Sequence, residues 1–533
     1  MAYLRDLREH IKLLEENGKL VRVRRQINKD TELMPFVRLQ FRGLPEEERM
    51  AFLFENVTDV KGRKYEMPVA VGIVAGSRDI YALGIGCSIE KFGEKWTQAI
   101  QHQLTPRLVA TGPVQDVVIV GDDLYKDGGG IEKIPVPIST PGFDNAPYTT
   151  ATHWMTKDLD TGIRNVGNYR SQVKAKDRLG IFVHPTRHIY VHWEKARKRG
   201  LPLEAALVMG GPPSIAYAAV AKVPYGVDEL AVSGALMGEP VEVVKCKTID
   251  MEVPAHGEIV IEGEMDTEFL EPEAPFGEYC GYVGDRVLNP FLKIKCITHR
   301  RDAIYHAITS QMPPSESSKI RQITYEGVMY KFLRYDCNNP AVLDVALHES
   351  GGCWAYVVIR MKKANPSQPW QALNAAVAFD PGLGKIIIAV DEDIDPRDPE
   401  SVNWALSFCM MPHRDMRVTM GKASMMDHSA APPGTLTHES LTFPTVQGTS
   451  AMLVDATRKW PYPPVSLPKQ KFMDRAIDLW EAEGLPKLKL RRPWYGYELG
   501  YWNPEFVEEA ELALLGEHYR TGEKLAERRV KMR

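Results

Sequence analysis

The sequence predicts an α/β protein of several domains. At 533 residues the chain exceeds an ordinary domain, and its length corresponds to roughly two to four domains. Residues 115–310 are rich in short β-branched runs, whereas helical and strand patterns mix before this segment and alternate after it. Such alternation is typical of layered α/β domains.

The N-terminal residues predict an amphipathic helix. Leu4, Leu7, Ile11 and Leu14 share one face, and Gly18 provides a stop signal at its end. The region up to about residue 120 then mixes helices with short apolar strands, and MPVAVGIV is one of these strands. We therefore expect the N-terminal part to contain both helices and strands.

Strands dominate the centre, and α/β alternation resumes after residue 315. The runs PVQDVVIVG, PVEVVKCKT, GEIVIEGEMD and FLKIKCITH predict strands separated by turn residues. One helix is predicted at 185–199, where Pro185 suits the first helical turn. Residues 385–395 predict a buried strand that leads into an acidic loop, and the tail beyond 465 predicts a helix from Pro504.

Composition excludes several classes of protein. The formal net charge is −4, so no global field attracts the chain to nucleic acid or membrane. No run of about eighteen apolar residues predicts a membrane span, and the N-terminus does not resemble a signal peptide. The seven cysteines are scattered, odd in number and without a Cys-x-x-Cys motif, which indicates reduced thiols in a cytoplasmic protein.

The segment EPEAPFGEYCGY (residues 271–282) carries the strongest chemical pattern. It places Glu273 and Glu278 around a Pro-Phe-Gly bend, where Pro275 and Gly277 favour a turn over a helix. Two acids at a fixed separation can divide their roles, one staying ionised while the other handles a proton. Taken alone, however, the segment favours a solvated acidic turn.

Polar residues in the middle segment indicate a particular chemistry less specifically than the acidic bend does. His188 and His192 are four residues apart, a spacing that suits either zinc or a structural helix face, and no His-Glu-x-x-His motif accompanies them. The Gly-Gly-Pro-Pro run at 210–213 allows close approach to a phosphate but also fits an ordinary turn. These patterns alone leave the chemistry open.

Several motifs in order resemble the UbiD family of reversible decarboxylases, which use prenylated flavin mononucleotide (prFMN). They are LFENVTDVKG near residue 53, RNVGNYRSQV at 164–173, the segment from VVKCKTIDMEVPAHGEIVIEG to EAPFGEYCGY, and MLVDATRKW at 452–460. The resemblance spans about 400 residues. It is therefore far more specific than any one motif.

The resemblance implies a role for particular residues. The metal-binding positions of the family fall on Asn165, His188 and Glu229, whose oxygen and imidazole donors suit Mn²⁺ or Mg²⁺ held against the cofactor phosphate. The catalytic positions fall on Arg170, Glu273 and Glu278. The resemblance also implies K⁺ as a further candidate ion beside the cofactor. The implied cofactor-binding residues are Asn165, Gly167, Arg170, Arg187, His188, Ala219, Ala221, Glu229 and Lys385.

Two positions depart from the family pattern. Arg187 stands where glutamine is frequent, and Ala219, Val220 and Ala221 replace a Ser-Met pair found in some members. We therefore expect the phosphate site to depend more on Arg187 and on backbone groups. Lys385 resembles a lysine found in some members only.

The implied chemistry follows from the need for an electron sink. Loss of CO₂ from an sp² carbon leaves a carbanion that no side chain stabilises adequately, so a cofactor must do so. Arg170 is expected to hold the substrate carboxylate and to keep Glu273 ionised, and Glu278 is expected to donate the replacing proton. The same site is expected to catalyse the reverse carboxylation as well.

The resemblance also implies an architecture and partners. We expect a flavin-reductase-like split β-barrel at 116–312, an N-terminal α/β region at 1–115, a C-terminal α/β lid at 313–465 and a tail at 466–533. A hinge is expected at 310–325. A UbiX-like flavin prenyltransferase would supply the cofactor, and the protein would form a homodimer or homohexamer.

The resemblance implies only a broad class of substrate. Family members act on aromatic and α,β-unsaturated acids. The stretch 485–502 joins Lys487, Lys489, Arg491 and Arg492 to five aromatic residues, which suits a coenzyme A thioester or an arm that packs on a neighbouring subunit. A non-catalytic subunit of an aryl carboxylase and an ordinary flavin oxidoreductase are the alternatives, although no Gly-x-Gly-x-x-Gly fingerprint supports the latter.

Overall fold

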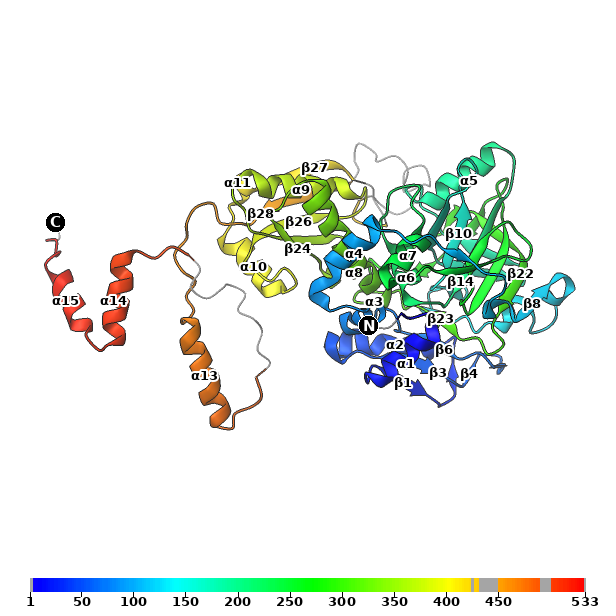
Figure 1. The fold of residues 1–533 in the computed structure, drawn as a ribbon, viewed down its shortest axis with the longest axis horizontal. Coiled ribbons are helices and arrows are strands. Elements are labelled where there is room, and N and C mark those ends of the chain that lie inside the picture. The colour runs from blue at the N-terminus through cyan, green and yellow to red at the C-terminus, as the bar shows by residue number, and fades with distance from the viewer. Residues whose placement is uncertain (1–2, 423–425, 431–448, 489–499, 532–533) are drawn as a thin grey trace.

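A computed structural model describes residues 3–422, 426–430, 449–488 and 500–531. Figure 1 shows a body in which the N-terminal and central regions pack together, a C-terminal α/β layer beside them, and a tail that extends away from all three. Mixed α/β content is therefore confirmed. Within the described residues, no helix is both long and apolar enough to cross a membrane.

The N-terminal region is a small α/β layer. Its four-stranded sheet has the order β1-β3-β6-β23, and α1 buries Leu7, Ile11 and Leu14 as its amphipathic pattern predicts. Asp6 caps α1, and Gly18 has φ +66° just after it. The elements are α1 (Leu7–Glu16), β1 (Leu20–Val23), β2 (Ile27–Asn28), α2 (Leu33–Gly43), β3 (Ala51–Phe54), β4 (Val57–Thr58), β5 (Lys64–Tyr65), β6 (Val69–Val71), α3 (Arg78–Ile85), α4 (Phe92–Gln101) and β7 (Arg107–Leu108).

The central region is built on a nine-stranded, entirely antiparallel sheet that curls into a half-barrel. Its order is β11-β10-β14-β17-β22-β13-β12-β9, and β8 pairs with β22. The predicted central strands are all present. The elements are β8 (Val117–Val120), β9 (Tyr148–Thr149), β10 (His153–Lys157), β11 (Arg164–Asn168), β12 (Ser171–Ala175), β13 (Arg178–Ile181), α5 (His188–Lys198), β14 (Leu203–Met209), α6 (Pro213–Val220), α7 (Glu229–Met237), β15 (Glu242–Lys245), β16 (Glu252–Pro254), β17 (Ile259–Met265), β18 (Glu271–Glu273), β19 (Phe276–Gly277), β20 (Val283–Gly284), β21 (Val287–Asn289), β22 (Phe291–His299) and β23 (Tyr305–Ala307).

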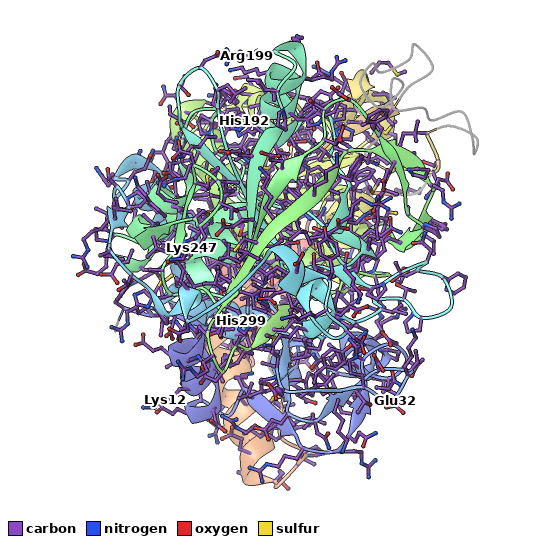
Figure 2. All side chains as sticks on the ribbon, turned by 90° about the vertical axis from the view of Figure 1, so that its right-hand side faces the viewer. Lys12, Glu32, His192, Arg199, Lys247 and His299 are labelled. Atoms are coloured by element: carbon purple, nitrogen blue, oxygen red, sulfur yellow. The ribbon has the colours of Figure 1, made fainter. Side chains whose placement is uncertain are left out.

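Figure 2 shows how the neighbouring elements lie along this sheet. The N-terminal region, marked by Lys12 and Glu32, lies at one end, and α5, marked by His192 and Arg199, lies at the other. The core between them contains Trp154, Leu207 and Ile261, none of which is exposed. Strand β23 hydrogen bonds to β6, so the central chain returns to the N-terminal sheet.

Helix α5 begins later than the sequence predicts. Pro185 lies in a turn, where the backbone N–H of Arg187 donates to the carbonyl of His184 at 3.0 Å. The hydroxyl of Thr186 also lies 2.9 Å from Nδ1 of His184. These contacts satisfy the polar groups of residues 184–187 outside a helix, and α5 therefore begins at His188.

The C-terminal region is an α/β layer of five strands in the order β24-β25-β26-β28-β27. The three central strands run parallel, and residues 386–391 form the buried strand that the sequence predicts. The elements are α8 (Glu316–Lys331), β24 (Val342–Leu347), β25 (Tyr356–Met361), α9 (Ser367–Phe379), β26 (Ile386–Asp391), α10 (Pro399–Phe408), α11 (Pro412–Asp415), β27 (Met416–Lys422) and β28 (Thr449–Asp455).

The segment expected to be a hinge is only partly a loop. Residues from Glu316 onward form α8, which Ser315 caps through the backbone N–H of Ser318. The carboxylate of Glu316 is buried and accepts backbone hydrogen bonds from Gly72, Val74 and Ala75 at 2.8, 3.2 and 3.3 Å. Residues 316–325 are therefore fixed to the N-terminal region, and only 310–315 has the form of a loop.

The tail contains α13 (Gln470–Ala482), α14 (Pro504–Leu514) and α15 (His518–Ala526). None of these helices contains a buried residue, and Figure 1 shows them away from the body. A helix does begin at Pro504, as predicted. Lys489, Arg491 and Arg492 of the basic and aromatic stretch lie outside the described residues, and the domain limits at 115, 312 and 465 stay predictions.

Candidate active site

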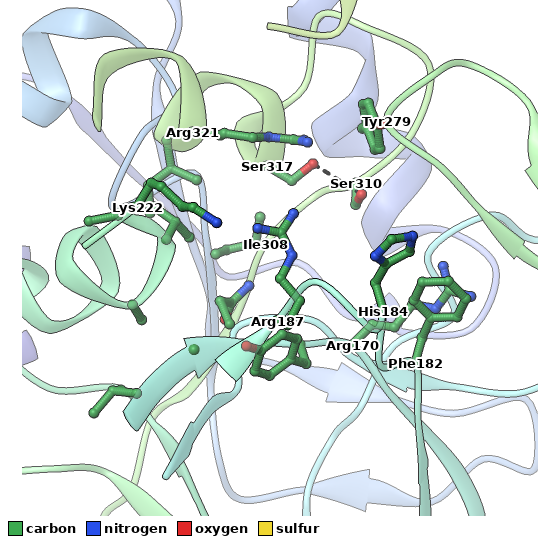
Figure 3. A pocket seen from close by; sticks show the side chains of 18 of the residues that line it. Arg170, Phe182, His184, Arg187, Lys222, Tyr279, Ile308, Ser310, Ser317 and Arg321 are labelled. Atoms are coloured by element: carbon green, nitrogen blue, oxygen red, sulfur yellow. Dashed lines mark hydrogen bonds between the residues drawn. The ribbon is translucent and has the colours of Figure 1, made fainter. Parts of the chain in front are cut away.

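One cavity of about 260 Å³ lies where β11, α5, α6, α7 and α8 meet. Figure 3 shows the side chains of Arg187, Lys222 and Arg321 converging on it. Most residues selected from the sequence line this cavity, although they come from widely separated segments. They are Asn165, Gly167, Arg170, Arg187, His188, Ala219, Ala221, Glu229 and Glu278.

Arg170 binds both acids of the bend. Its Nε and Nη2 donate to the two oxygens of Glu273 at 2.9 and 2.8 Å, a bidentate pair, and its Nη1 contacts Glu278. The guanidinium lies 4.6 Å from the ring of Phe182 and 4.9 Å from that of Phe276. Both acids are buried, with Glu273 fully so and Glu278 6% exposed. The alternative of a solvated acidic turn is therefore wrong.

Side chains that no motif indicated hold this bend in shape. Ala274 has φ +81°, a conformation unfavourable for a residue with a Cβ. Its N–H donates to the hydroxyl of Tyr148 at 3.2 Å, and its carbonyl accepts from Asn145 Nδ2 at 3.1 Å. Asp144 accepts from the N–H of Gly277 at 2.9 Å, and burial raises the pKa of Asp144. These contacts offset the strain and fix both acids relative to Arg170.

Three elements bring the predicted metal-binding residues together. Asn165 lies on β11, His188 is the first residue of α5, and Glu229 is the first residue of α7. Oε2 of Glu229 accepts from the backbone N–H of Val166 at 2.7 Å. Burial raises the pKa of Glu229 to about 8 and lowers that of His188 to about 4.

This donor set fits a divalent ion on chemical grounds. Asn165 offers an amide oxygen, His188 a neutral imidazole and Glu229 a carboxylate. Glu229 is nearly inaccessible and has no cationic partner of its own in the described chain. An ion would favour the charged form of Glu229. Among the described residues, no three His, Cys, Asp or Glu side chains form a metal-binding group. The predicted set contains only two side chains of these types, His188 and Glu229, and its third member is the amide of Asn165.

Cationic side chains enter the same cavity from two loops. Tyr325 and Asp380 raise the pKa of Arg187 against the opposing effect of its burial, and Nζ of Lys222 lies 3.4 Å from Oδ2 of Asp380. Gly167 lacks a side chain on β11, where a Cβ would collide with the ring of Tyr169. Positive charge and a close backbone are what an anionic phosphate requires.

Two predicted features lie away from the cavity lining. Nζ of Lys385 donates to Asp427 at 2.7 Å, and the side chain is about half exposed, so its position does not support a role in holding the cofactor. His192 lies behind His188 on α5, with its Nδ1 2.9 Å from the hydroxyl of Thr156. That contact gives His192 a structural role, consistent with the resemblance.

The structure adds one wall that sequence reasoning missed. Ser317, Arg321 and Tyr325 recur every four residues along α8 and line the cavity. Tyr279, directly after Glu278, also lines it. The i, i+4 recurrence was visible in the sequence, but nothing there indicated that this face of α8 meets β11 and α5.

Comparison with known proteins establishes the family. Models of the 3-octaprenyl-4-hydroxybenzoate carboxy-lyase match the N-terminal domain at residues 11–100, the Rift-related domain at 107–313 and the C-terminal domain at 320–456. The chain belongs to the UbiD family of carboxy-lyases. Its resemblance to that family is therefore confirmed.

Relatives and solved structures agree with this assignment. A phenolic acid decarboxylase of Bacillus subtilis is 29% identical and covers 89% of this chain and 99% of its own. The UbiD-class enzyme HmfF from Pelotomaculum thermopropionicum in complex with FMN is 32% identical, covers 89% and 99%, and has a TM-score of 0.75. Vanillic acid decarboxylase of Sedimentibacter hydroxybenzoicus is 26% identical, covers 91% and 100%, and has a TM-score of 0.77.

Proposed function

We propose that this protein catalyses the reversible, non-oxidative decarboxylation of an aromatic or α,β-unsaturated carboxylic acid with prFMN as cofactor. The pairing of buried Glu273 and Glu278 with the guanidinium of Arg170, which lines the cavity together with Glu278, carries the proposal. An evolved form of HmfF, 32% identical to this chain, is known in complex with prFMN. Two relatives are named decarboxylases, which supports the same reaction.

The cofactor phosphate would lie at the end of the cavity with Asn165, His188 and Glu229. A divalent ion, Mn²⁺ or Mg²⁺, would join these donors to the phosphate, and K⁺ is a further candidate. Arg187 and Lys222 would balance the remaining phosphate charge. When bound, prFMN supplies the electron sink that no side chain provides.

The residues at the other end would orient the acid and move a proton. Arg170 lies between two aromatic rings and presents a planar fork that suits a carboxylate. Glu273 holds that fork in place through its bidentate pair. Glu278 lines the cavity, so it would donate the proton that replaces CO₂ and take it back in the carboxylation direction.

The proposal also covers the architecture of the protein, its location and its partners. The curled central sheet supports a flavin-reductase-like split barrel, with the C-terminal layer as a lid. All seven cysteines are free thiols, which supports a cytoplasmic location. A UbiX-like flavin prenyltransferase would supply the cofactor. The exposed apolar side chains of the tail support a homodimer or homohexamer over a coenzyme A site, and Phe472, Phe506 and Leu514 are examples.

Substitution of the proton donor tests the proposed reaction. Glu278→Gln preserves the size of the side chain and its capacity to form hydrogen bonds, but the amide cannot donate a carboxylic proton. We expect turnover on accepted aromatic or acrylic acids to fall by about 100-fold or more, while prFMN binding persists. The measurement is CO₂ release by protein coproduced with a flavin prenyltransferase, with bound cofactor quantified by absorbance and native mass spectrometry.

The matched control is Glu268→Gln, an exposed acid on the loop before β18. It should retain wild-type turnover. Wild-type turnover in Glu278→Gln would exclude Glu278 as proton donor, and a folded wild-type protein that never binds flavin would favour a non-catalytic subunit. Flavin reduction by a nicotinamide donor without CO₂ release would favour an oxidoreductase.

A further inference from the structure

Four Lys or Arg side chains line the cavity in the described part of the chain, and three of them have acidic partners nearby. Arg170 pairs with Glu273 and contacts Glu278. Nζ of Lys222 lies 3.4 Å from Asp380, and the charge of Arg187 lowers the pKa of Asp380 against the effect of its burial. The fourth, Arg321, differs from these three.

Arg321 lies among aromatic rings. Its guanidinium carbon is 4.2 Å from the ring centre of Tyr279 and 5.2 Å from that of Trp354. Among the described residues it makes no hydrogen bond or ion pair with an acid, and the nearby charge of Arg187 repels it. Burial lowers the pKa of Arg321, as expected for a cation whose lost hydration is not offset.

Helix α8 aims this cation into the cavity. Ser317 and Tyr325, one turn before and one turn after Arg321, line the same cavity. Ser317 Oγ donates to Ser310 Oγ at 3.0 Å. Figure 3 shows Arg321 beside Ser317 on one side of the cavity, whereas Arg170 lies with Phe182 and His184 on the other.

The surroundings of Arg321 suit the binding of an anion. A guanidinium stacked on aromatic rings keeps its in-plane N–H groups available, and their fork matches a carboxylate. The hydroxyls of Ser310 and Ser317 add hydrogen-bonding capacity beside it. Phe182 and Phe276 beside Arg170, and Tyr279 beside Arg321, line the same cavity, and their rings suit a flat, unsaturated molecule.

We propose that Arg321 binds a second carboxylate of the substrate, so that the enzyme acts on an aromatic or unsaturated dicarboxylic acid. This inference rests on the proposed function and makes its substrate class narrower. Arg170 would orient the carboxylate that leaves as CO₂, and Arg321 would hold the one that stays. A monocarboxylic acid would leave Arg321 without a partner.

Binding of matched acids tests the inference without depending on turnover. Dissociation constants of benzoate, isophthalate and terephthalate are measured by calorimetry with cofactor-loaded wild type, Arg321→Gln and Arg321→Lys. We expect wild type to prefer a dicarboxylate, and Arg321→Gln to weaken that ligand by about 30-fold or more while changing benzoate less than about threefold. Arg321→Lys should keep part of the preference, since it retains the charge but loses the fork.

Arg301→Gln, an exposed arginine in the turn before β23, is the control and should change neither ligand. Equal weakening of benzoate and dicarboxylates in Arg321→Gln, or no dicarboxylate preference in wild type, would overturn the inference. If the preference depends on Arg321 but no acid is decarboxylated, the proposed function fails and the second carboxylate site stands. If monocarboxylic acids are decarboxylated and Arg321→Gln has no effect, the proposed function stands and the second carboxylate site is overturned.

Discussion

Glu229 shows how a single buried group creates a need for a ligand. It is 3% exposed, and its described hydrogen bond comes from the backbone of Val166. Burial raises its pKa from 4.5 to about 8, so its ionisation disfavours the folded state until a cation offsets the charge. At neutral pH, Glu229 is therefore stable in the folded protein mainly as a neutral acid or as a metal ligand.

This shift predicts a pH-dependent cost in the metal-free protein. Because the folded pKa lies above the unfolded value, the cost is absent below pH 4.5 and grows as pH rises toward 8. Glu229→Gln should remove it and raise the free energy of unfolding by up to roughly 4 kcal/mol at pH 8. Thermal denaturation of the metal-free wild type and Glu229→Gln at pH 5 and pH 8 measures the effect. The same stability difference between the two proteins at both pH values would contradict it.

His188 gives a second prediction at the same scale. We expect His188→Ala to lose bound metal and flavin together, because the ion would join the protein to the cofactor phosphate. Metal analysis and flavin absorbance of the purified protein measure both losses. His192→Asn is the matched change on the same helix and should lower the melting temperature while keeping the cofactor, since His192 contacts Thr156. Loss of flavin without loss of metal would contradict the proposed bridge.

At the scale of elements, α8 connects the three regions of the body. Nζ of Lys319 is fully buried and lies 2.8 Å from Glu46 in the N-terminal region and 2.6 Å from Glu349 in the C-terminal region. Arg49 also pairs with Glu349 at 3.0 Å. Removing one member of such a network leaves buried charges unpaired, which is far costlier than losing a surface pair.

Lys319→Met should therefore destabilise the protein by about 3–5 kcal/mol. Lys331→Met is the control at the end of the same helix, where the partner Asp336 is 44% exposed, and it should cost less than about 1 kcal/mol. Lys319 and Arg49 lower the pKa of Glu349 to about 2 against its burial. This stabilisation is complete above pH 4.5 and is lost as pH falls toward 2, so the difference between wild type and Lys319→Met should narrow there. Denaturant unfolding at pH 7 and pH 3 measures it.

At the scale of the molecule, the tail is the part that the body does not cover. Helices α13, α14 and α15 have no buried residue, yet Leu479, Trp480, Leu515 and Tyr519 are exposed apolar side chains. Such a density of apolar surface indicates an interface. A second copy of the chain would cover it in the proposed homo-oligomer.

Ending the chain at Pro468 should convert the oligomer to a monomer. The melting temperature of the body should change little at low protein concentration, because the deleted helices bury nothing against it. Native mass spectrometry and light scattering give the subunit number. A truncated protein with the subunit number of the full chain would show that the interface lies elsewhere.

The sequence by itself determined the features that depend on neighbouring residues. The apolar periods of α1 and β22 predicted these elements, because burial on one face requires such spacing, and the continuous apolar runs of β17 and β26 predicted strands buried on both faces. The motif order indicated the UbiD family and hence Arg170, Glu273 and Glu278. The position of Pro185 was less informative, because local hydrogen bonds among residues 184–187 form a turn there and α5 begins only at His188.

Only the tertiary structure decided which distant groups meet. Tyr148 and Asn145 support Ala274 from more than a hundred residues away, and α8 places Arg321 in the same cavity as Glu278. It also kept Lys385 outside the cavity lining. No local pattern encodes such contacts, because they arise from the packing of whole sheets and helices against one another and not from the spacing of residues along one element.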